Sequence, residues 1–186
     1  MIEAEVKAVV REPEQVMQSL EARAQGRAEI YEDTYFDTPG RDLDGDDREL
    51  RVRTVHGQES TRSVLTYKGA RVDDVTGSKP EHETMVDNPQ AVHAMLRALG
   101  FEPSIALSKR CRNYEFEAAG RRMLATLVRV PELDGTFLEL ETMVSENDEL
   151  AAALDDIRAV LRDLGIEDRD LTNELYTDAV ASRRSI

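Results

Sequence analysis

The chain has 186 residues, of which 38 are acidic and 24 basic, so its formal net charge at pH 7 is −14. This charge argues against a protein that binds nucleic acid or an anionic membrane through its overall field. No apolar run approaches the roughly 20 residues of a membrane span, no signal peptide precedes the first strand, and the single cysteine fits a reducing compartment. Together these features predict one cytoplasmic domain over residues 1–186.

The basic residues are unevenly divided, because only four of them are lysine and the others are arginine. An acidic, lysine-poor composition is typical of proteins adapted to high salt, where screening weakens the repulsion between like charges. We therefore expect a halophilic protein. The remaining lysines all fall in predicted strands, which indicates specific roles for Lys7, Lys68, Lys79 and Lys109.

Residues 2–10 alternate between apolar and polar side chains, which predicts a half-buried β-strand. Alternate side chains of a strand share one face. Glu3, Glu5 and Lys7 therefore lie on one face of this strand, and the apolar residues lie on the other.

The same kind of pattern returns along the chain between short helical segments. Strands are predicted at residues 28–38, 50–53, 64–68, 79–86, 105–118, 121–130 and 137–141. Helices are predicted at residues 13–24, 91–99, 149–164 and 171–181, and residues 41–47 read as a polar loop. This order predicts an α+β fold, with an eight-stranded antiparallel β-barrel and flanking helices.

If the helices cover the apolar faces of these strands, the charged rows face the interior of the barrel. Charged side chains taken out of water need partners or a charged ligand, because an unpaired buried charge costs several kcal/mol. The alternative is a barrel whose charged rows form salt ladders on the outside. The rows are Glu3, Glu5 and Lys7; Arg51 and Arg53; Lys68; Lys79, Glu81 and Glu83; Arg110 and Arg112; and Glu139 and Glu141.

The presence of both acidic and basic side chains in these rows favours a metal–triphosphate ligand. Converging arginines and lysines suit phosphate oxygens, and arginine supplies a planar pair of donors. Carboxylates at i and i+2 of a strand suit Mg²⁺ or Mn²⁺, which prefer hard oxygen ligands. A simple anion would leave the carboxylates without a role.

The motifs resemble those of the CYTH, or triphosphate tunnel, superfamily. The first strand is similar to its E-x-E-x-K signature, and the resemblance continues in order over nearly the whole chain. Later matching segments are residues 35–38, 50–53, 65–69, 79–83, 109–114 and 135–141. The resemblance implies an eight-stranded antiparallel tunnel that binds a triphosphate with divalent metal.

The resemblance also implies roles for single residues. The metal-facing carboxylates would be Glu3, Glu5, Glu139 and Glu141. The phosphate-binding residues would be Lys7, Arg51, Arg53, Lys68, Lys79, Arg110 and Arg112. Lys68 matches a lysine that triphosphatases of this family use to activate water, so it is the catalytic candidate. Glu81 and Glu83 would be further ligands or partners of the basic rows.

The chain departs from the family pattern at two places. The family usually has an aspartate shortly before the Gly-x-Phe of its last motif, where this chain has Val128 or Arg129; Asp134 is the nearest further candidate. The basic strand usually has an arginine three residues before its tyrosine, where this chain has Cys111. These departures affect the expected activity more than the expected fold.

We expect a metal-dependent enzyme, with class IV adenylate cyclase-like conversion of ATP to cyclic AMP and pyrophosphate as the first hypothesis. The alternatives are a triphosphatase acting on a nucleoside, thiamine or inorganic triphosphate, and a non-catalytic nucleotide- or polyphosphate-binding module. The expected cofactor is Mg²⁺ or Mn²⁺. The expected partner is ATP, thiamine triphosphate or tripolyphosphate. We expect binding to neither nucleic acid nor a membrane. The oligomeric state that we consider is a homodimer.

Overall fold

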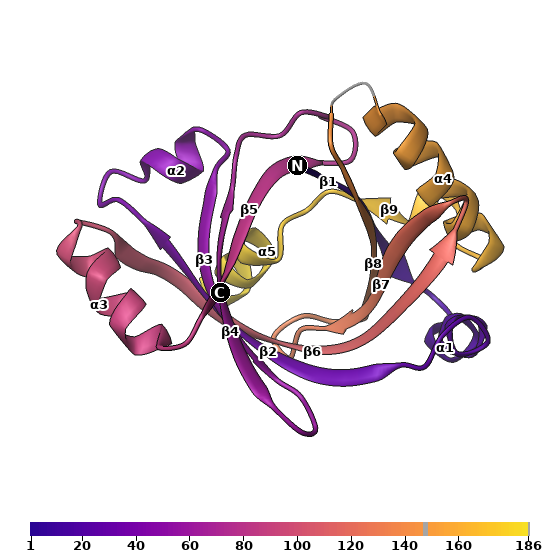
Figure 1. Ribbon diagram of the computed structural model, residues 1–186, viewed down its shortest axis with the longest axis horizontal. Helices are drawn as coiled ribbons and strands as arrows, with labels where there is room; N and C mark the ends of the chain where they lie inside the picture. The colour runs from indigo at the N-terminus through magenta and orange to yellow at the C-terminus, as the bar shows by residue number, and fades with distance from the viewer. Residues whose placement is uncertain (147–148, 186) are drawn as a thin grey trace.

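A computed structural model describes residues 1–146 and 149–185. Its centre is one antiparallel sheet that curls into a ring, with four helices around the outside and α5 (Tyr176–Arg184) lying over the ring (Figure 1). The strands of the ring are β1 (Ile2–Val10), β2 (Arg27–Asp37), β3 (Glu49–His56), β4 (Thr61–Lys68), β5 (Lys79–Val86), β6 (Glu102–Ala118), β7 (Arg121–Arg129) and β8 (Thr136–Val144). The order around the sheet is β5-β4-β3-β2-β6-β7-β8-β1. The prediction of eight antiparallel strands with flanking helices is confirmed, in the form of a tunnel.

The helices are α1 (Pro13–Glu21), α2 (Asp42–Gly45), α3 (Pro89–Ala98), α4 (Leu150–Asp163) and α5. Helices α1, α3 and α4 pack on the outer, apolar faces of the strands, whereas α5 packs at one mouth of the ring. The largest buried cluster joins Val6 and Leu140 of the sheet to Leu20 of α1 and Ile157 of α4. A smaller cluster joins Leu96 of α3 to Phe36 and Val52. Because these helices lie outside, the polar side chains on the opposite faces of the strands point into the ring.

The ring closes over a short length. β1 pairs with β8 along all nine of its residues but with β5 at only two positions, Ile2 opposite Pro80 and Glu3 opposite Lys79. Further along, the free edge of β1 pairs with β9 (Leu171–Thr172), which the sequence did not predict. This short strand satisfies edge N–H and C=O groups that would otherwise lack partners.

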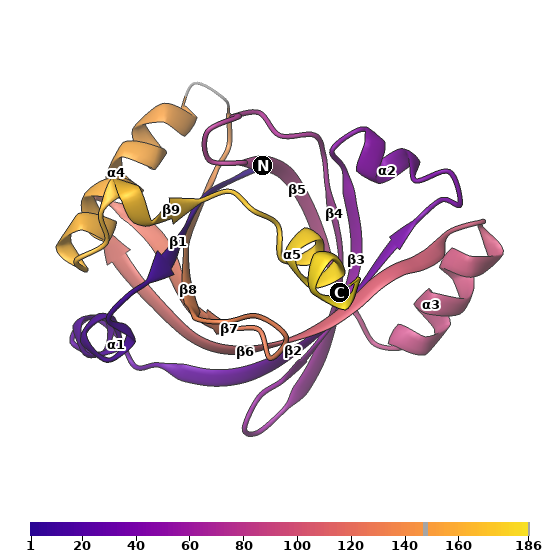
Figure 2. The same cartoon turned by 180° about the vertical axis from the view of Figure 1, so that it is seen from behind.

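Two predicted segments differ from the structure. The predicted loop at residues 41–47 contains the short helix α2, because the buried Asp37 carboxylate accepts hydrogen bonds from the N–H groups of Thr38, Leu43 and Asp44. The helix predicted at residues 171–181 begins only at Tyr176, since β9 occupies its first residues. Helix α5 and the segment before it lie across one mouth of the tunnel (Figure 2).

No helix among the described residues is long and apolar enough to cross a membrane.

Candidate active site

Three carboxylates meet on the inner wall of the tunnel. Glu5 and Glu141 are directly opposite one another on β1 and β8, and Glu3 precedes Glu5 on the same face of β1. One oxygen of each carboxylate lies within 4.8 Å of the others. Burial raises the pKa of Glu5 to about 7, and the charges of Glu3 and Glu139 add to this effect. Burial and the same crowding raise the pKa of Glu141.

Glu139, the fourth predicted metal ligand, lies one step further along β8 and has different neighbours. Its carboxylate is 3.8 Å from the ammonium of Lys109. Burial opposes ionisation of Glu139, but Lys109 and Lys7 outweigh it and lower the pKa of the carboxyl. Burial lowers the pKa of Lys7, against the attraction of Glu139 and Glu5. The structure thus brings three of the four predicted ligands into one cluster and places Glu139 among lysines.

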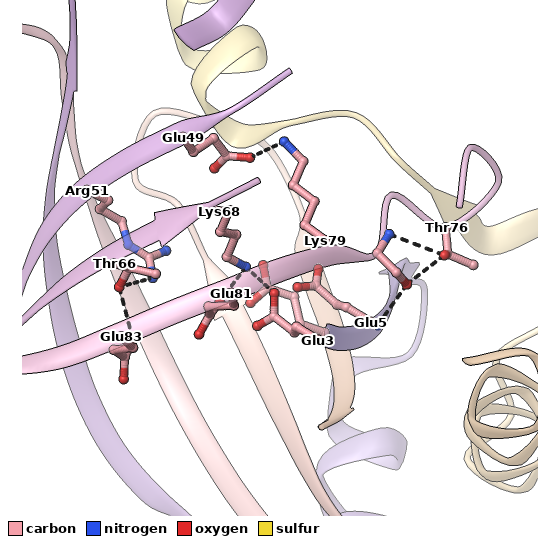
Figure 3. A network of polar contacts seen from close by, with 12 residues as sticks. Glu3, Glu5, Glu49, Arg51, Thr66, Lys68, Thr76, Lys79, Glu81 and Glu83 are labelled. Atoms are coloured by element: carbon pink, nitrogen blue, oxygen red, sulfur yellow. Dashed lines mark hydrogen bonds and ion pairs between the residues drawn. The ribbon is translucent and has the colours of Figure 1, made fainter. Parts of the chain in front are cut away.

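Lys68 of β4 reaches the carboxylate cluster from the same side of the ring, because only β5 separates β4 from β1 (Figure 3). Its ammonium donates to Glu3 and lies 3.1 Å from Glu81 of β5. Burial disfavours this charge, but Glu3, Glu5 and Glu81 together raise the pKa of Lys68 well above its ordinary value. Lys68 is therefore a firmly held cation, and Glu81 serves as its partner.

Two further predicted cations lie beside Lys68. Lys79 donates to Glu49 at 2.8 Å and to the backbone carbonyl of Asp47 at 2.8 Å (Figure 3). Arg51 donates through Nη2 to Thr66, which in turn donates to Glu83. Among the described residues, the buried Nε of Arg51 has no hydrogen-bond partner. An unpaired buried N–H group on a cation is a favourable position for an anionic ligand.

Arg53 is held by Asp33, a residue that sequence reasoning missed. The guanidinium donates to both oxygens of Asp33, at 2.6 and 2.8 Å, and lies 4.3 Å from the centre of the Tyr31 ring. Burial alone would raise the pKa of Asp33, but Arg53 holds it well below its ordinary range. The Asp33 side chain is 0% exposed and that of Arg53 is 15% exposed, so the carboxylate is fully enclosed while the guanidinium lines the cavity.

The predictions for Arg110, Arg112 and Asp134 are wrong about where these side chains lie. Arg110 is exposed, and Arg112 donates to Tyr114 and Glu21 on the outer face of β6. Alternation along β6 instead turns Lys109 into the cavity. Asp134 forms an ion pair with Arg183 at the surface, does not line the cavity, and so does not join the carboxylate cluster.

The C-terminal segment contributes residues that no local pattern indicated. The ammonium of Lys7 donates to the backbone carbonyl of Glu174. The Tyr176 ring lies 4.4 Å from the ammonium of Lys7 and 4.3 Å from that of Lys109. Tyr176 and Val180 pack against apolar residues that include Val130 and Phe137. This segment therefore shields Lys7 and Lys109 at its end of the tunnel.

These side chains surround one cavity of about 280 Å³, near the lower limit for small-molecule sites. Its walls combine the carboxylate cluster with the cations of β3, β4 and β5 and with Lys7 and Lys109. The predicted convergence of acidic and basic rows on one cavity is thus present. Glu83, an exposed residue of β5, lies at its edge.

Comparison with known proteins gives consistent results. A family model described as the CYTH domain matches residues 1–176. A Methanocaldococcus jannaschii protein named "Putative adenylate cyclase MJ0240" is 26% identical over 180 residues, which cover 96% of this chain and 98% of that protein.

Two solved structures show the same fold. The PH1819 protein from Pyrococcus horikoshii is 27% identical, with a TM-score of 0.83 and coverage of 98% of this chain and 99% of that one. A Hippeastrum protein, HpAC1, is 17% identical, with a TM-score of 0.65 and coverage of 97% and 95%. Its structure is described as that of a "putative adenylyl cyclase" with "a dominant triphophatase activity".

Proposed function

The chain belongs to the CYTH domain family, and we propose that it is a metal-dependent enzyme that acts on a triphosphate inside the tunnel. The observation that carries this proposal is the composition of the cavity wall. Three crowded carboxylates, Glu3, Glu5 and Glu141, line one cavity together with Lys68 and its neighbouring arginines. A metal-bound polyphosphate is the ligand that satisfies both sets of charges.

The carboxylate cluster fits a divalent cation. All three groups offer hard oxygen donors, which Mg²⁺ and Mn²⁺ prefer. Without a cation, burial and then the repulsion between these carboxylates raise the pKa of Glu5 and of Glu141. We propose that Glu3, Glu5 and Glu141 hold the ion. When bound, such an ion neutralises and polarises phosphate oxygens.

The cations of β3 and β4 would bind the phosphate groups. Within the described part of the chain the buried Nε–H of Arg51 has no partner, while Asp33 fixes the orientation of Arg53. Lys68 is the residue to which we assign a catalytic role. Its ammonium lies between the wall and the carboxylate cluster, where it would stabilise negative charge that develops on the transferred or departing phosphate.

Our first candidate reaction is the cyclisation of ATP. The ribose 3′-hydroxyl would attack the α-phosphorus and lose its proton, a new P–O bond would form, and the bond to the β-phosphate would break to release pyrophosphate. The name of the M. jannaschii relative supports this choice.

Hydrolysis of a triphosphate is the second candidate, and the activity stated for the Hippeastrum protein supports it. There water would attack the γ-phosphorus and orthophosphate would leave. Non-catalytic binding is the third, and the position of Asp134 favours it, because this carboxylate pairs with Arg183 instead of completing the acidic cluster.

The test is incubation with ATP, thiamine triphosphate and tripolyphosphate plus Mg²⁺ or Mn²⁺ in high KCl. Cyclic AMP with pyrophosphate supports cyclisation, and orthophosphate supports hydrolysis. Replacing Glu3 and Glu5 together by Gln should lower turnover by about 100-fold or more while leaving the fold intact. The matched control replaces the exposed Glu102 and Glu117 of β6 by Gln. No product from any substrate, or full activity in the Glu3/Glu5 variant, would contradict the proposal.

A further inference from the structure

The two carboxylates on the inner face of β8 meet different partners on β1. Glu141 is directly opposite Glu5, whereas Glu139, one inward position further along, is directly opposite Lys7. Beyond this pair, β8 continues with Phe137, which packs against apolar residues. The charged part of this wall therefore changes over one step from the carboxylate cluster to a pair of opposite charges.

Two ammonium groups surround Glu139. Lys7 is its cross-strand neighbour, and the ammonium of Lys109 lies 3.8 Å from its carboxylate. Both lysines are buried, and the Tyr176 ring covers them, with its centre 4.4 Å from the first ammonium and 4.3 Å from the second. This lysine–glutamate group (Lys7, Lys109 and Glu139) has a net positive charge. It would repel a divalent cation, whereas the carboxylate cluster sets three acidic groups against the single ammonium of Lys68.

In the part of the chain that the structure describes, the lysine–glutamate group lacks the further oxygen donors of a second metal site. Val128, at one of the two positions where the aspartate of the family pattern would fall, is fully buried and directly opposite Cys111 in an apolar cluster. Asp134 lies at the surface, in an ion pair with Arg183. Within residues 1–146 and 149–185, the carboxylate cluster is the only set of three His, Cys, Asp or Glu side chains whose ligand atoms lie within 4.8 Å of one another.

The ammonium of Lys109 has hydrogen-bond donors that the protein does not use. The side chain is 5% exposed and lines the cavity. Its ion pair among the described residues is the 3.8 Å contact with Glu139, which is too long for a hydrogen bond. The buried hydroxyl of Tyr176, beside it, also forms no hydrogen bond of normal geometry within the described residues. Buried donors without acceptors favour an anionic ligand such as a phosphate group.

Resting on the proposed function, we infer that this chain uses a single divalent cation, bound by the carboxylate cluster, and that Lys7 and Lys109 supply the positive charge that a second cation would supply. In sites with two metal ions, the ions together stabilise the attacking and the leaving oxygen. Ammonium groups held by a carboxylate and an aromatic ring stabilise developing negative charge without exchanging with the solvent. One part of the triphosphate would thus lie at the ion and another part at Lys109.

The experiment counts the bound ions directly. Mn²⁺ is titrated into the protein at pH 8, and electron paramagnetic resonance measures the free ion. High KCl screens weak binding to the acidic surface. We expect one tightly bound ion per chain in the wild type, and binding weakened by about tenfold or more in Glu5→Gln, which loses a ligand oxygen. Glu139→Gln should keep the ion with its affinity changed less than about threefold, because salt screens a charge that is not a ligand. Glu102→Gln, at an exposed position of β6, is the matched control.

A second measurement tests the role of Lys109. Imidotriphosphate, an analogue of tripolyphosphate with nitrogen at the bridging positions, is titrated by calorimetry at saturating Mn²⁺. Lys109→Gln should weaken its binding by about tenfold or more, because a hydrogen bond from a charged donor is lost. The number of ions bound by the free protein should stay at one. Arg110→Gln removes an exposed charge at the next position of the same strand, and this matched control should change binding less than about twofold.

The outcomes separate this inference from the proposed function. Two tightly bound ions in the wild type, or loss of an ion in Glu139→Gln, would overturn the inference and leave a metal-dependent enzyme. A wild type that binds no ion tightly would refute the metal site of the proposed function, and this inference with it. Unchanged imidotriphosphate binding in Lys109→Gln would overturn the role of the ammonium groups. The two variants lie on different strands, so misfolding of one leaves the other test in place.

Discussion

Replacing Glu5 by Gln should stabilise the metal-free protein at alkaline pH. Burial and the charges of Glu3 and Glu139 raise the pKa of Glu5 from 4.5 to about 7 in the folded state. The unfolded chain loses these contacts, so the folded state binds more protons between these two pH values. The free energy of unfolding of the wild type therefore falls as pH rises from about 4.5 to about 7. Glutamine keeps the size of the side chain and removes the charge.

The size of the effect follows from the same two pKa values. Their difference corresponds to about 3 kcal/mol, fully developed above pH 7 and absent below pH 4.5. In a chain of 186 residues, this raises Tm by roughly 6 to 12 °C at pH 8. Mg²⁺ should reverse the order of stability, since it binds the wild-type carboxylates and not the variant.

The assay is urea unfolding with EDTA at pH 4.5 and pH 8, for the wild type, Glu5→Gln and the exposed control Glu102→Gln. We expect the Glu5 variant to exceed the wild type only at pH 8, and the control to match the wild type at both values. A Glu5→Gln protein that is less stable than the wild type at pH 8, or a difference that does not change with pH, would refute the reasoning about charge crowding.

Three other predictions concern the rest of the molecule. Asp33→Asn should lower the free energy of unfolding by about 3 kcal/mol, because it leaves Arg53 without its partner. Asp46→Asn, at an exposed ion pair, is the control and should cost less than about 1 kcal/mol. Urea titration measures both values. Burial raises the pKa of Cys111 to about 12, so a thiol reagent such as DTNB should label it only after unfolding, and rapid labelling of the native protein would contradict this. The net charge of −14 predicts that stability rises between 0.1 and 2 M KCl; full stability in dilute buffer would argue against adaptation to salt.

Alternation along single strands was sufficient to place most of the charged rows. In β1 and β8 the charged residues all take one phase, so Glu3, Glu5 and Glu141 could be turned inward from the sequence. In β6 both phases carry charged residues, and the comparison of motifs emphasised Arg110 over Lys109. The structure resolves this ambiguity, because the neighbours on β2 and β7 fix which phase faces the cavity.

Other parts of the site depend on contacts between distant segments. Asp33 follows another acidic residue in a strand, and nothing local indicates that it meets Arg53 of the next strand. Helix α5 has a weakly amphipathic sequence, so its pattern does not reveal that Tyr176 docks between two lysines. The first contact is set by the register of β2 against β3 and the second by the docking of α5 at the tunnel mouth, and local propensity encodes neither.

The closure of the ring also determines when the site can form. Glu3 and Glu5 lie in β1, yet this strand pairs with β8 and with β9, which are far from it in the sequence. Pairings of such long range are slow to form, because the loop entropy is lost before the contact is gained. A nascent chain that stops before β8 lacks Glu141 and the strand against which β1 places Glu5. The acidic cluster therefore assembles only after β8 has been made.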